Sequence, residues 1–499
     1  MAKFVLAMDA GTTSNRAILF DERCEIVSME QQEFTQYFPQ PGLVEHDAEE
    51  IWETMLFVAK RAIEKGNASA KDIACIGITN QRETAVVWEK ATGKPLGHAI
   101  VWQDRRTADY CDQLIEAGET AFFKDRTGLI IDPYFSATKI KWILEHNPGA
   151  YERAARGELL FGTVETWLIW KLSGGKIHVT DYSNASRTML YNIFELKWDK
   201  EILDKFGIPE AMLPEVKESS FVYGNTDKHI FGEAIPISGA AGDQQSALFG
   251  QTCFNRGDAK NTYGTGCFLL MNTGETPVRS DTGLVTTIAW GEGGRVEYAL
   301  EGSVFVAGSA IQWLRDELRI IPSAPASEEI ARSVPDTNGC YVVPAFTGLA
   351  APHWDPYARG AVLGLTRGVN REHLVRATVE SLAYQSYDVL RAMEEDLQAP
   401  LGTIRVDGGA SANDFLMQFQ ADLMNEVIDR PACVETTAMG AAFLAGLAVG
   451  FFKSKEELIR YRRSGAVFRP HMAQEERTRK IHMWHKAVDC VKGWAREGE

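Results

Sequence analysis

The segment VLAMDAGTTSNRAILFD, residues 5–21, constrains the fold of this chain more than any other segment. Two apolar stretches flank residues 10–16, which are small, hydroxylated or polar. Valine, leucine and isoleucine favour strands, and Gly11 can take the positive φ that a tight hairpin turn requires. The segment therefore predicts a strand, a turn and a second strand.

The composition of this turn suggests a ligand. Asn-Gly or Asp-Gly closes many tight hairpins, whereas this turn is Gly-Thr-Thr-Ser and offers backbone N–H groups and three hydroxyls to an anion. A phosphate held by backbone donors, with Asp9 near enough to hold a hydrated cation, is the functional interpretation. An ordinary structural turn is the alternative.

The same pattern recurs weakly in AKNTYGTGCFLLMNTGE, residues 259–275, where Gly264 and Gly266 follow the first turn by about half a chain length. We therefore expect two related halves that face one ligand, residues 1–250 and 251–499. Between the two turns, amphipathic helices and strands alternate, as α/β domains require.

Several helices have recognisable ends. Asp47 is expected to cap a helix, with Glu50 three residues later as its capping partner and Gly66 as the stop. A second long helix is expected to start from Asn370. The strand after it leads through Gly408–Gly409 into another helix, whose N-terminal N–H groups would suit a phosphate or ribose, a tight turn being the alternative.

Composition excludes several classes of protein. The chain has a net charge of −16, and no basic run is longer than RYRR at 460–463, so we expect no nucleic-acid binding. Eight cysteines without a C-x-x-C pair argue against a zinc site and a disulfide framework, and indicate reduced, cytoplasmic thiols. The first strand begins almost at once, so we expect no signal peptide.

Other motifs are absent or point to burial. The 17-residue uncharged run at 436–452 is rich in alanine and glycine and slightly short for a bilayer. We expect a buried helix packed closely on a sheet rather than membrane insertion. No P-loop, H-R-D loop or complete G-x-G-x-x-G occurs, which disfavours the corresponding nucleotide-binding families.

Three aspartates share one context. Asp9, Asp243 and Asp407 each follow an apolar stretch and precede small residues, which is where open α/β sheets carry their ligands. Each could instead cap a turn. Three such residues in one chain favour a common site.

Six segments, in order along the chain, together resemble the FGGY family of carbohydrate kinases, and within it the members that phosphorylate glycerol: MDAGTTSNRAILFD, ITNQRETAVVWE, VWQDRR, GDQQSALFG, YGTGCF and DGGASANDFLMQFQAD. Residues 134–146 and 348–368 are similar to the family's two signature segments. The resemblance implies an α/β fold of two actin-like, ribonuclease-H-like domains with a cleft between them, and ATP bound mainly by the second domain.

The resemblance also implies ATP- and Mg²⁺-dependent phosphorylation of glycerol to sn-glycerol 3-phosphate, in which amide donors and a metal neutralise charge. Asp9 and Asp243 would hold Mg²⁺ through water. The residues expected at ATP and its phosphates are Thr12, Thr13, Ser14, Arg16, Thr265, Gly308, Gln312, Gly409 and Asn413. Those expected at glycerol are Arg82, Glu83, Trp102, Tyr134, Asp243, Gln244 and Phe268.

Asp243 is our expected general base, because a carboxylate within hydrogen-bond reach can accept the proton of the terminal hydroxyl. Aspartate is a weak base, so its position matters more than its proton affinity. A polyol both donates and accepts hydrogen bonds, so its pocket should contain an arginine and a carboxylate, as Arg82 and Glu83 provide. Adjacent residues point to opposite faces of a regular strand, so both reach one ligand only if the strand ends or bulges there. An ion-paired strand edge is the alternative.

Two other functions are compatible with parts of the pattern. A kinase for another polyol or ketose, such as xylulose or erythritol, would share most of these residues. An actin-like filament or chaperone ATPase would have the phosphate turns without the acceptor residues, and Arg82, Glu83 and Trp102 argue against it.

His229 is a candidate regulatory site. Some bacterial members of the resembled group carry a histidine in an H-F-Y-G segment that a phosphocarrier protein phosphorylates, and this chain has His-Ile-Phe-Gly, a partial match. An added phosphoryl group would bring negative charge to an exposed loop. An ordinary surface histidine is the alternative. We also expect a homo-oligomer, a dimer or a tetramer.

Overall fold

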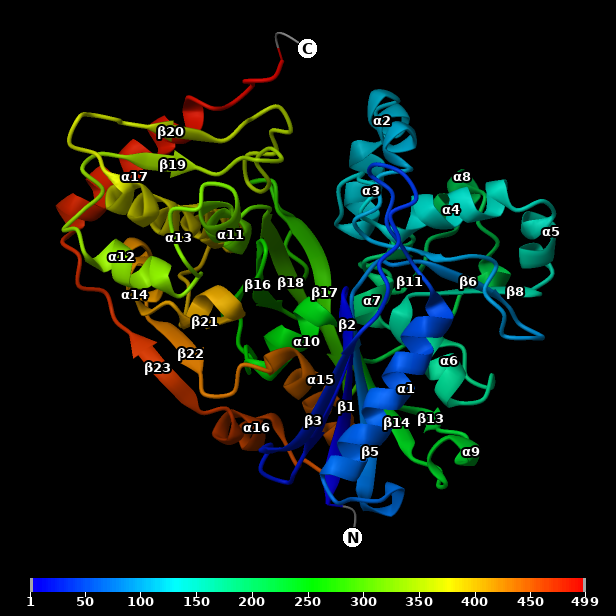
Figure 1. Cartoon of the computed structure of the whole chain (residues 1–499). Coiled ribbons are helices and arrows are strands. Elements are labelled where there is room, and N and C mark those ends of the chain that lie inside the picture. Colours follow the sequence, from blue (N-terminus) through cyan, green and yellow to red (C-terminus); the bar gives the residue numbers. More distant parts are fainter. Residues whose placement is uncertain (1–2, 497–499) are drawn as a thin grey trace.

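The computed structural model describes residues 3–496, and its first two strands form the predicted hairpin (Figure 1). Strands β1 (Phe4–Ala10) and β2 (Ser14–Phe20) pair antiparallel without a break in register. The expected positive φ at Gly11 is wrong. A glycine suits this position for another reason, since a Cβ there would lie 3.0 Å from the Ser14 carbonyl oxygen.

The hairpin belongs to a 13-stranded sheet. Its other strands are β3 (Ile26–Glu33), β5 (Ile73–Asn80), β13 (Ser220–Asn225), β14 (Pro236–Gly242), β15 (Ala259–Tyr263), β16 (Cys267–Gly274), β17 (Val285–Glu292), β18 (Arg295–Val304), β21 (Ile404–Asp407), β22 (Ile428–Pro431) and β23 (Ser464–Phe468). Shorter strands lie outside it: β4 (Glu45–His46), β6 (Val86–Glu89), β7 (Ala99–Ile100), β8 (Leu159–Gly162), β9 (Val179–Asp181), β10 (Tyr191–Asn192), β11 (Lys197–Trp198), β12 (Glu215–Lys217), β19 (Tyr341–Val343) and β20 (Ala361–Leu363).

One strand order occurs twice in this sheet. It reads β3-β2-β1-β5-β14 in the first half of the chain and β18-β16-β15-β21-β22 in the second. In each half, three antiparallel strands precede two that run parallel to the first strand of the hairpin. The predicted second hairpin, β15 and β16, is confirmed, and the repeat is what two related halves require. The boundary near residue 250 stays a prediction.

The two halves share the sheet at one point. Strands β13 and β17 pair in parallel through Ser220 and Glu292 alone. Figure 1 shows the N-terminal half, in blue to green, on one side of this junction and the yellow and red C-terminal segments on the other. Strand β14, after which the expected base Asp243 follows, lies next to β13, so the junction is close to the candidate site in the sheet order.

The helices are distributed over both halves of the chain. In the first half they are α1 (Ala48–Lys65), α2 (Ala108–Glu116), α3 (Thr120–Thr127), α4 (Ser136–His146), α5 (Ala150–Ala155), α6 (Val164–Leu172), α7 (Tyr182–Ala185), α8 (Lys200–Phe206), α9 (Lys228–Phe231) and α10 (Asp243–Gly250). In the second half they are α11 (Gly308–Asp316), α12 (Ala326–Arg332), α13 (Arg371–Leu397), α14 (Asp414–Met424), α15 (Thr436–Ala448), α16 (Lys455–Tyr461) and α17 (Gln474–Asp489).

The predicted caps are confirmed in part. The carboxylate of Asp47 accepts from the Glu49 amide at the start of α1, and the Asn370 side chain accepts from the His373 amide at the start of α13. The expected capping role of Glu50 is wrong, because its carboxylate accepts from the amide and hydroxyl of Thr35 instead.

The glycine turn after β21 also differs from the prediction. Gly408 has a φ of 83°, but α14 begins only at Asp414, after a 3₁₀ turn over Gly409–Ala412. The Asn413 side chain caps α14 by accepting from the Leu416 amide at 2.9 Å. The helix therefore starts where a capping side chain is available, not at the glycines.

Helix α15 confirms the predicted buried helix. A Cβ on Gly77 of β5 would lie 2.1 Å from the Ala441 carbonyl oxygen, and a Cβ on Gly440 would lie 1.8 Å from that of Ser246 in α10. The helix thus touches the sheet and α10 backbone to backbone through its small residues. Among the described residues no helix is long and apolar enough to cross a membrane.

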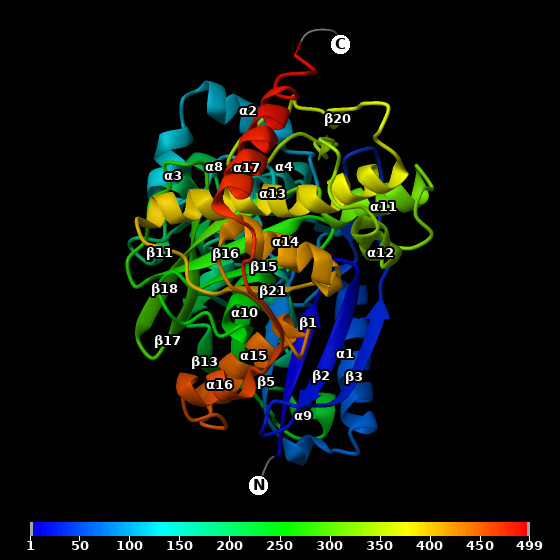
Figure 2. The same ribbon diagram turned by 90° about the vertical axis from the view of Figure 1, so that its left-hand side faces the viewer.

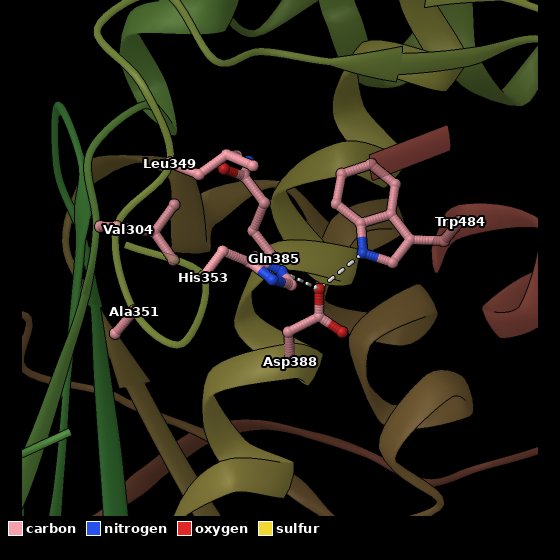
Figure 3. Close-up of a pocket in the computed structure, with 8 residues that line it drawn as sticks. Val304, Leu349, Ala351, His353, Gln385, Asp388 and Trp484 are labelled. Atoms are coloured by element: carbon pink, nitrogen blue, oxygen red, sulfur yellow. Dashed lines mark hydrogen bonds and ion pairs between the residues drawn. The ribbon is translucent and has the colours of Figure 1, made fainter. Parts of the chain in front are cut away.

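The C-terminal helix α17 runs across α13, as Figure 2 shows. Asp388 of α13 joins them, because its carboxylate accepts from Trp484 Nε1 at 2.7 Å and lies 2.8 Å from His485 Nε2. His353, on the loop before β20, approaches the same carboxylate to 3.4 Å (Figure 3). A cavity of about 10 Å³ beside Asp388 is large enough for one water.

Candidate active site

The turn between β1 and β2 has bonded carbonyls and free amides. Each carbonyl oxygen accepts from a neighbouring segment: Gly11 from Gln81 Nε2 (3.1 Å), Thr12 from Gln36 Nε2 (3.1 Å) and Thr13 from Phe34 N (3.3 Å). Within residues 3–496, the amides of Thr12 and Thr13 form no hydrogen bond. A turn with its carbonyls held elsewhere and its amides free is suited to an anion.

Asp9 lies beside this turn, opposite Arg16 in the hairpin register. Desolvation raises the pKa of Asp9 to about 7, outweighing the effect of the Arg16 guanidinium, and the Asp243 carboxylate raises it further. Arg16 itself pairs with Glu435, the residue before α15. A carboxyl group whose pKa is raised in this way needs a nearby cation to stay ionised.

The other two aspartates differ from each other. Asp243 is the first residue of α10, and its side chain is one-third exposed. Asp407 is buried and accepts from Gln251 Nε2 at 2.9 Å and Thr436 Oγ1 at 2.6 Å, so its carboxylate bonds the neighbouring helix ends. The Asp407 carboxylate is thus occupied within the protein, and the ligand roles of Asp9 and Asp243 stay predictions.

These residues fit a hydrated ion. Among the described residues no group of three or more His, Cys, Asp and Glu side chains is placed to hold a metal. Mg²⁺ usually keeps several waters and takes one or two carboxylates plus substrate phosphates, which matches Asp9 and Asp243 next to an anion-binding turn.

The acceptor residues lie where β5 ends. The strand stops at Asn80, and Glu83 has a φ of 61°, so the predicted strand end before Arg82 and Glu83 is confirmed. Both side chains are at most 3% exposed. Arg82 Nη2 donates to Tyr134 Oη at 3.3 Å, and the rings of Tyr134 and Trp102 meet edge to face with centroids 5.5 Å apart. We call Arg82, Glu83, Trp102 and Tyr134 the acceptor cluster.

Two charged residues that the sequence analysis missed complete this cluster. Glu301 of β18 accepts two hydrogen bonds from Arg82, at 2.7 and 2.9 Å, and Arg187 donates to Glu83 at 2.7 Å and to Glu301 at 3.2 Å. Burial alone would raise the pKa of Glu301, but the guanidiniums of Arg187 and Arg82 outweigh it and lower that pKa to about 2. The only sequence signal for Glu301 is a carboxylate within a largely apolar strand. Arg82 and Glu83, just after the end of β5, thus also form the ion pairs that the alternative interpretation expects.

Lys260 was missed as well. Its ammonium is fully buried and donates to Gln244 Oε1, to Thr262 Oγ1 at 2.9 Å and to the Phe268 carbonyl at 3.2 Å. Burial lowers the pKa of Lys260 to about 8, although the carboxylates of Asp407 and Asp243 oppose this. Gln244 and Phe268, two of the residues expected at glycerol, are therefore held together by one cation from β15.

The residues of the second half that are expected at ATP lie on the loops after β15 and β21 and on α11. The turn at Gly264–Gly266 packs on the start of α11, where the Ser309 amide donates to the Thr265 carbonyl at 3.1 Å. A Cβ on Gly308 would lie 2.5 Å from the Gly264 carbonyl oxygen. Thr265, Gln312 and Gly409 are exposed, and Asn413 is occupied as the cap of α14. Their contacts with ATP stay predictions.

Comparison with known proteins identifies the family. The N-terminal domain of the FGGY family of carbohydrate kinases matches residues 4–250, and its C-terminal domain matches residues 259–449. The chain belongs to the FGGY family of carbohydrate kinases. Among similar relatives of this FGGY kinase, the glycerol kinase of Agathobacter rectalis is 64% identical over the full length of both chains. Glycerol kinase 1 of Clostridium tetani is 60% identical over 99% of each.

Solved structures confirm the fold of this FGGY kinase. Plasmodium falciparum glycerol kinase with ADP superposes with a TM-score of 0.93 at 37% identity, covering 98% of each chain. A xylulose kinase from Lactobacillus acidophilus has a TM-score of 0.86 at 21% identity over 98% of this chain and 97% of its own, which shows the fold alone. The expected two-domain α/β architecture of the actin-like type is therefore confirmed.

In this FGGY kinase, His229 lies on a different element from the other expected site residues. It is exposed in α9, the short helix between β13 and β14, and its amide donates to the Asp227 carboxylate that caps this helix. The predicted exposed position is confirmed. Phosphorylation of His229 stays a prediction.

Proposed function

We propose that this FGGY kinase transfers the γ-phosphoryl group of ATP to the terminal hydroxyl of glycerol, giving sn-glycerol 3-phosphate. The buried Arg82–Glu83 pair carries the proposal, together with the ring of Tyr134, which Arg82 contacts, and that of Trp102, which packs on Tyr134. A guanidinium donates to hydroxyl oxygens, a carboxylate accepts from hydroxyl hydrogens, and aromatic rings cover the carbon chain. The full-length relatives that are 60 to 64% identical are named glycerol kinases, which supports this acceptor over a ketose.

Asp243 is the proposed general base. The hydroxyl proton passes to its carboxylate as the oxygen forms a bond to the γ-phosphorus, and the bond from that phosphorus to the β-bridging oxygen breaks. Gln244 Nε2 donates to Asp243 Oδ2 at 3.1 Å and Arg82 Nε lies 3.3 Å from Oδ1, so the carboxylate is held toward the acceptor cluster. Position rather than basicity is what this arrangement supplies.

The turn at residues 11–14 is proposed to receive the phosphoryl group. The free amides of Thr12 and Thr13 and the hydroxyls of Thr12, Thr13 and Ser14 would surround its oxygens. Trp102 Nε1 donates to Thr12 Oγ1 at 3.0 Å, which links this turn to the acceptor cluster. Mg²⁺, held through water by Asp9 and Asp243, would neutralise phosphate charge.

ATP is proposed to lie against the second half. Strands β15 and β21 are parallel neighbours, with Thr262 opposite Asp407, so the loops after them emerge at the same edge of the sheet. These loops carry Thr265 and Gly409, and the position of a Cβ on Gly409 has no atom within 4 Å, so its backbone is open to a ligand.

The test is glycerol-dependent ADP release by the purified chain, compared with xylulose and erythritol. Asp243→Asn should lower kcat by about 100-fold while glycerol still binds. Asp258→Asn, a half-buried carboxylate paired with Arg405, is the matched control and should keep kcat. Release with xylulose but not glycerol would contradict the acceptor, and near-normal turnover of Asp243→Asn would contradict the base.

We further propose a cytoplasmic homo-oligomer, a dimer or a tetramer, whose activity a phosphocarrier protein raises through His229. The exposure of His229 supports access by such a partner. Sedimentation measures the oligomeric state. Intact mass and activity after incubation with a phosphorylated carrier, for wild type and His229→Ala, test the modification, and wild type that gains neither mass nor activity refutes it.

A further inference from the structure

His46, the last residue of β4, is completely buried between two glutamine side chains. Its Nε2 lies 2.8 Å from Gln36 Oε1, and its Nδ1 lies 3.3 Å from Gln81 Nε2. An amide oxygen only accepts, so His46 Nε2 carries the proton and Nδ1 accepts from Gln81. Burial lowers the pKa of His46 to about 4, which agrees with this neutral ring.

Each glutamine also forms a hydrogen bond with the turn at residues 11–14. Gln81 Nε2 also donates to the Gly11 carbonyl, and Gln36 Nε2 donates to the Thr12 carbonyl, both at 3.1 Å. The imidazole thus bridges the two groups that hold two successive carbonyls of the turn.

These two carbonyls determine where the free amides point. In a trans peptide the C=O of one residue and the N–H of the next lie in one plane and point in opposite directions. Holding the Gly11 carbonyl therefore directs the Thr12 amide the other way, and holding the Thr12 carbonyl does the same for the Thr13 amide. Neither of these two amides forms a hydrogen bond within residues 3–496.

We propose that His46 is a positioning residue for phosphoryl transfer, which aims the amides of Thr12 and Thr13 at the γ-phosphoryl group through Gln81 and Gln36. The inference rests on the proposed function only in taking this turn as the γ-phosphate site. His46 itself touches neither substrate. Without His46, the peptide groups of the turn would be free to rotate. The effect would fall on binding of the γ-phosphoryl group, which ATP carries and ADP lacks.

His46→Phe tests this, because it keeps an aromatic ring beside Phe34 and removes both hydrogen bonds. We expect the dissociation constant of adenylyl imidodiphosphate to rise by about tenfold and kcat to fall by roughly 10- to 100-fold, while ADP and glycerol bind as before. His46→Gln, whose amide can donate to Gln36 and accept from Gln81, should recover most of the activity.

His178→Phe is the matched control, because it removes a bond from a histidine to the Phe161 carbonyl outside the site. Equal losses in the two phenylalanine variants, or equal weakening of ADP and its triphosphate analogue, would overturn the proposal. If His46→Phe does not fold, replacement of the half-buried Gln36 by methionine, Gln36→Met, allows the same comparison. An unchanged ratio of the affinities for ADP and for the triphosphate analogue would then overturn the proposal. Glycerol-dependent ADP release by the wild type reports separately on the proposed function.

Discussion

Replacement of Glu301 by glutamine removes the negative charge that holds Arg82 from the second half of the chain. The pKa of Glu301 falls from 4.5 to about 2, and one pKa unit corresponds to roughly 1.4 kcal/mol. The ionised carboxylate thus contributes about 3 kcal/mol to folding at neutral pH. Because its folded pKa is depressed, this contribution is present above the unfolded pKa and is lost as pH falls through the folded value.

Glu301→Gln should therefore lower the free energy of unfolding by about 3 kcal/mol, the size expected when one partner of a buried ion pair is removed. Arg82 would lose its two bonds to a charged acceptor, so the glycerol KM should rise by about tenfold, while the ATP KM stays within about twofold. Urea denaturation and steady-state kinetics at neutral pH measure the two effects.

Glu297→Gln is the control on the same strand. Glu297 pairs with Lys455 at 3.1 Å, and both side chains are partly exposed, so its loss should cost about 1 kcal/mol or less. If Glu301→Gln is no more destabilising than Glu297→Gln and leaves the glycerol KM unchanged, the buried charges do not organise the acceptor cluster and the reasoning is refuted.

Three further predictions concern Lys139, Gly440 and His485. The Lys139 ammonium donates to the carbonyls of Pro133, Tyr134 and Phe135, so Lys139→Met should raise the glycerol KM about fivefold or more with little change in the ATP KM, measured by initial rates. Gly440→Ala should lower the thermal unfolding midpoint sharply, whereas Gly97→Ala, which meets no atom within 4 Å, should not. The Asp388 carboxylate raises the pKa of His485, so this pair stabilises α17 at low pH and its contribution is lost as pH rises through the raised value. Amide exchange in α17, corrected for intrinsic rates, should accelerate across that range, and Asp388→Asn should abolish the change.

Much of the local structure could be predicted from the sequence. The two hairpins follow from short apolar stretches around glycine and threonine, the caps at Asp47 and Asn370 from side chains next to their own helices, and the buried α15 from its run of small residues. These features depend on residues that are neighbours along the chain. The family resemblance added the candidate site residues, of which the structure brings Arg82 and Tyr134 into contact.

Local prediction failed where a second hydrogen-bonding partner competed with the expected one. Glu50 bonds Thr35 on another segment, and α14 starts at the capping Asn413 rather than at the glycines before it. Thr35 and Glu50 are 15 residues apart, which is too far for a helix-capping pattern to connect them, and the sequence alone does not show which of two nearby starting points the packed chain will use for α14.

The sequence by itself determined the hydroxyl-rich turn, its repeat and the pair Arg82–Glu83, because each is encoded within a few residues. Only the tertiary structure decided which groups hold them. Glu301 is 219 residues from Arg82, and His46 is 35 residues from Gln81. A charged or polar group in the interior must be paired, but its partner is supplied by whichever segment the tertiary fold brings beside it.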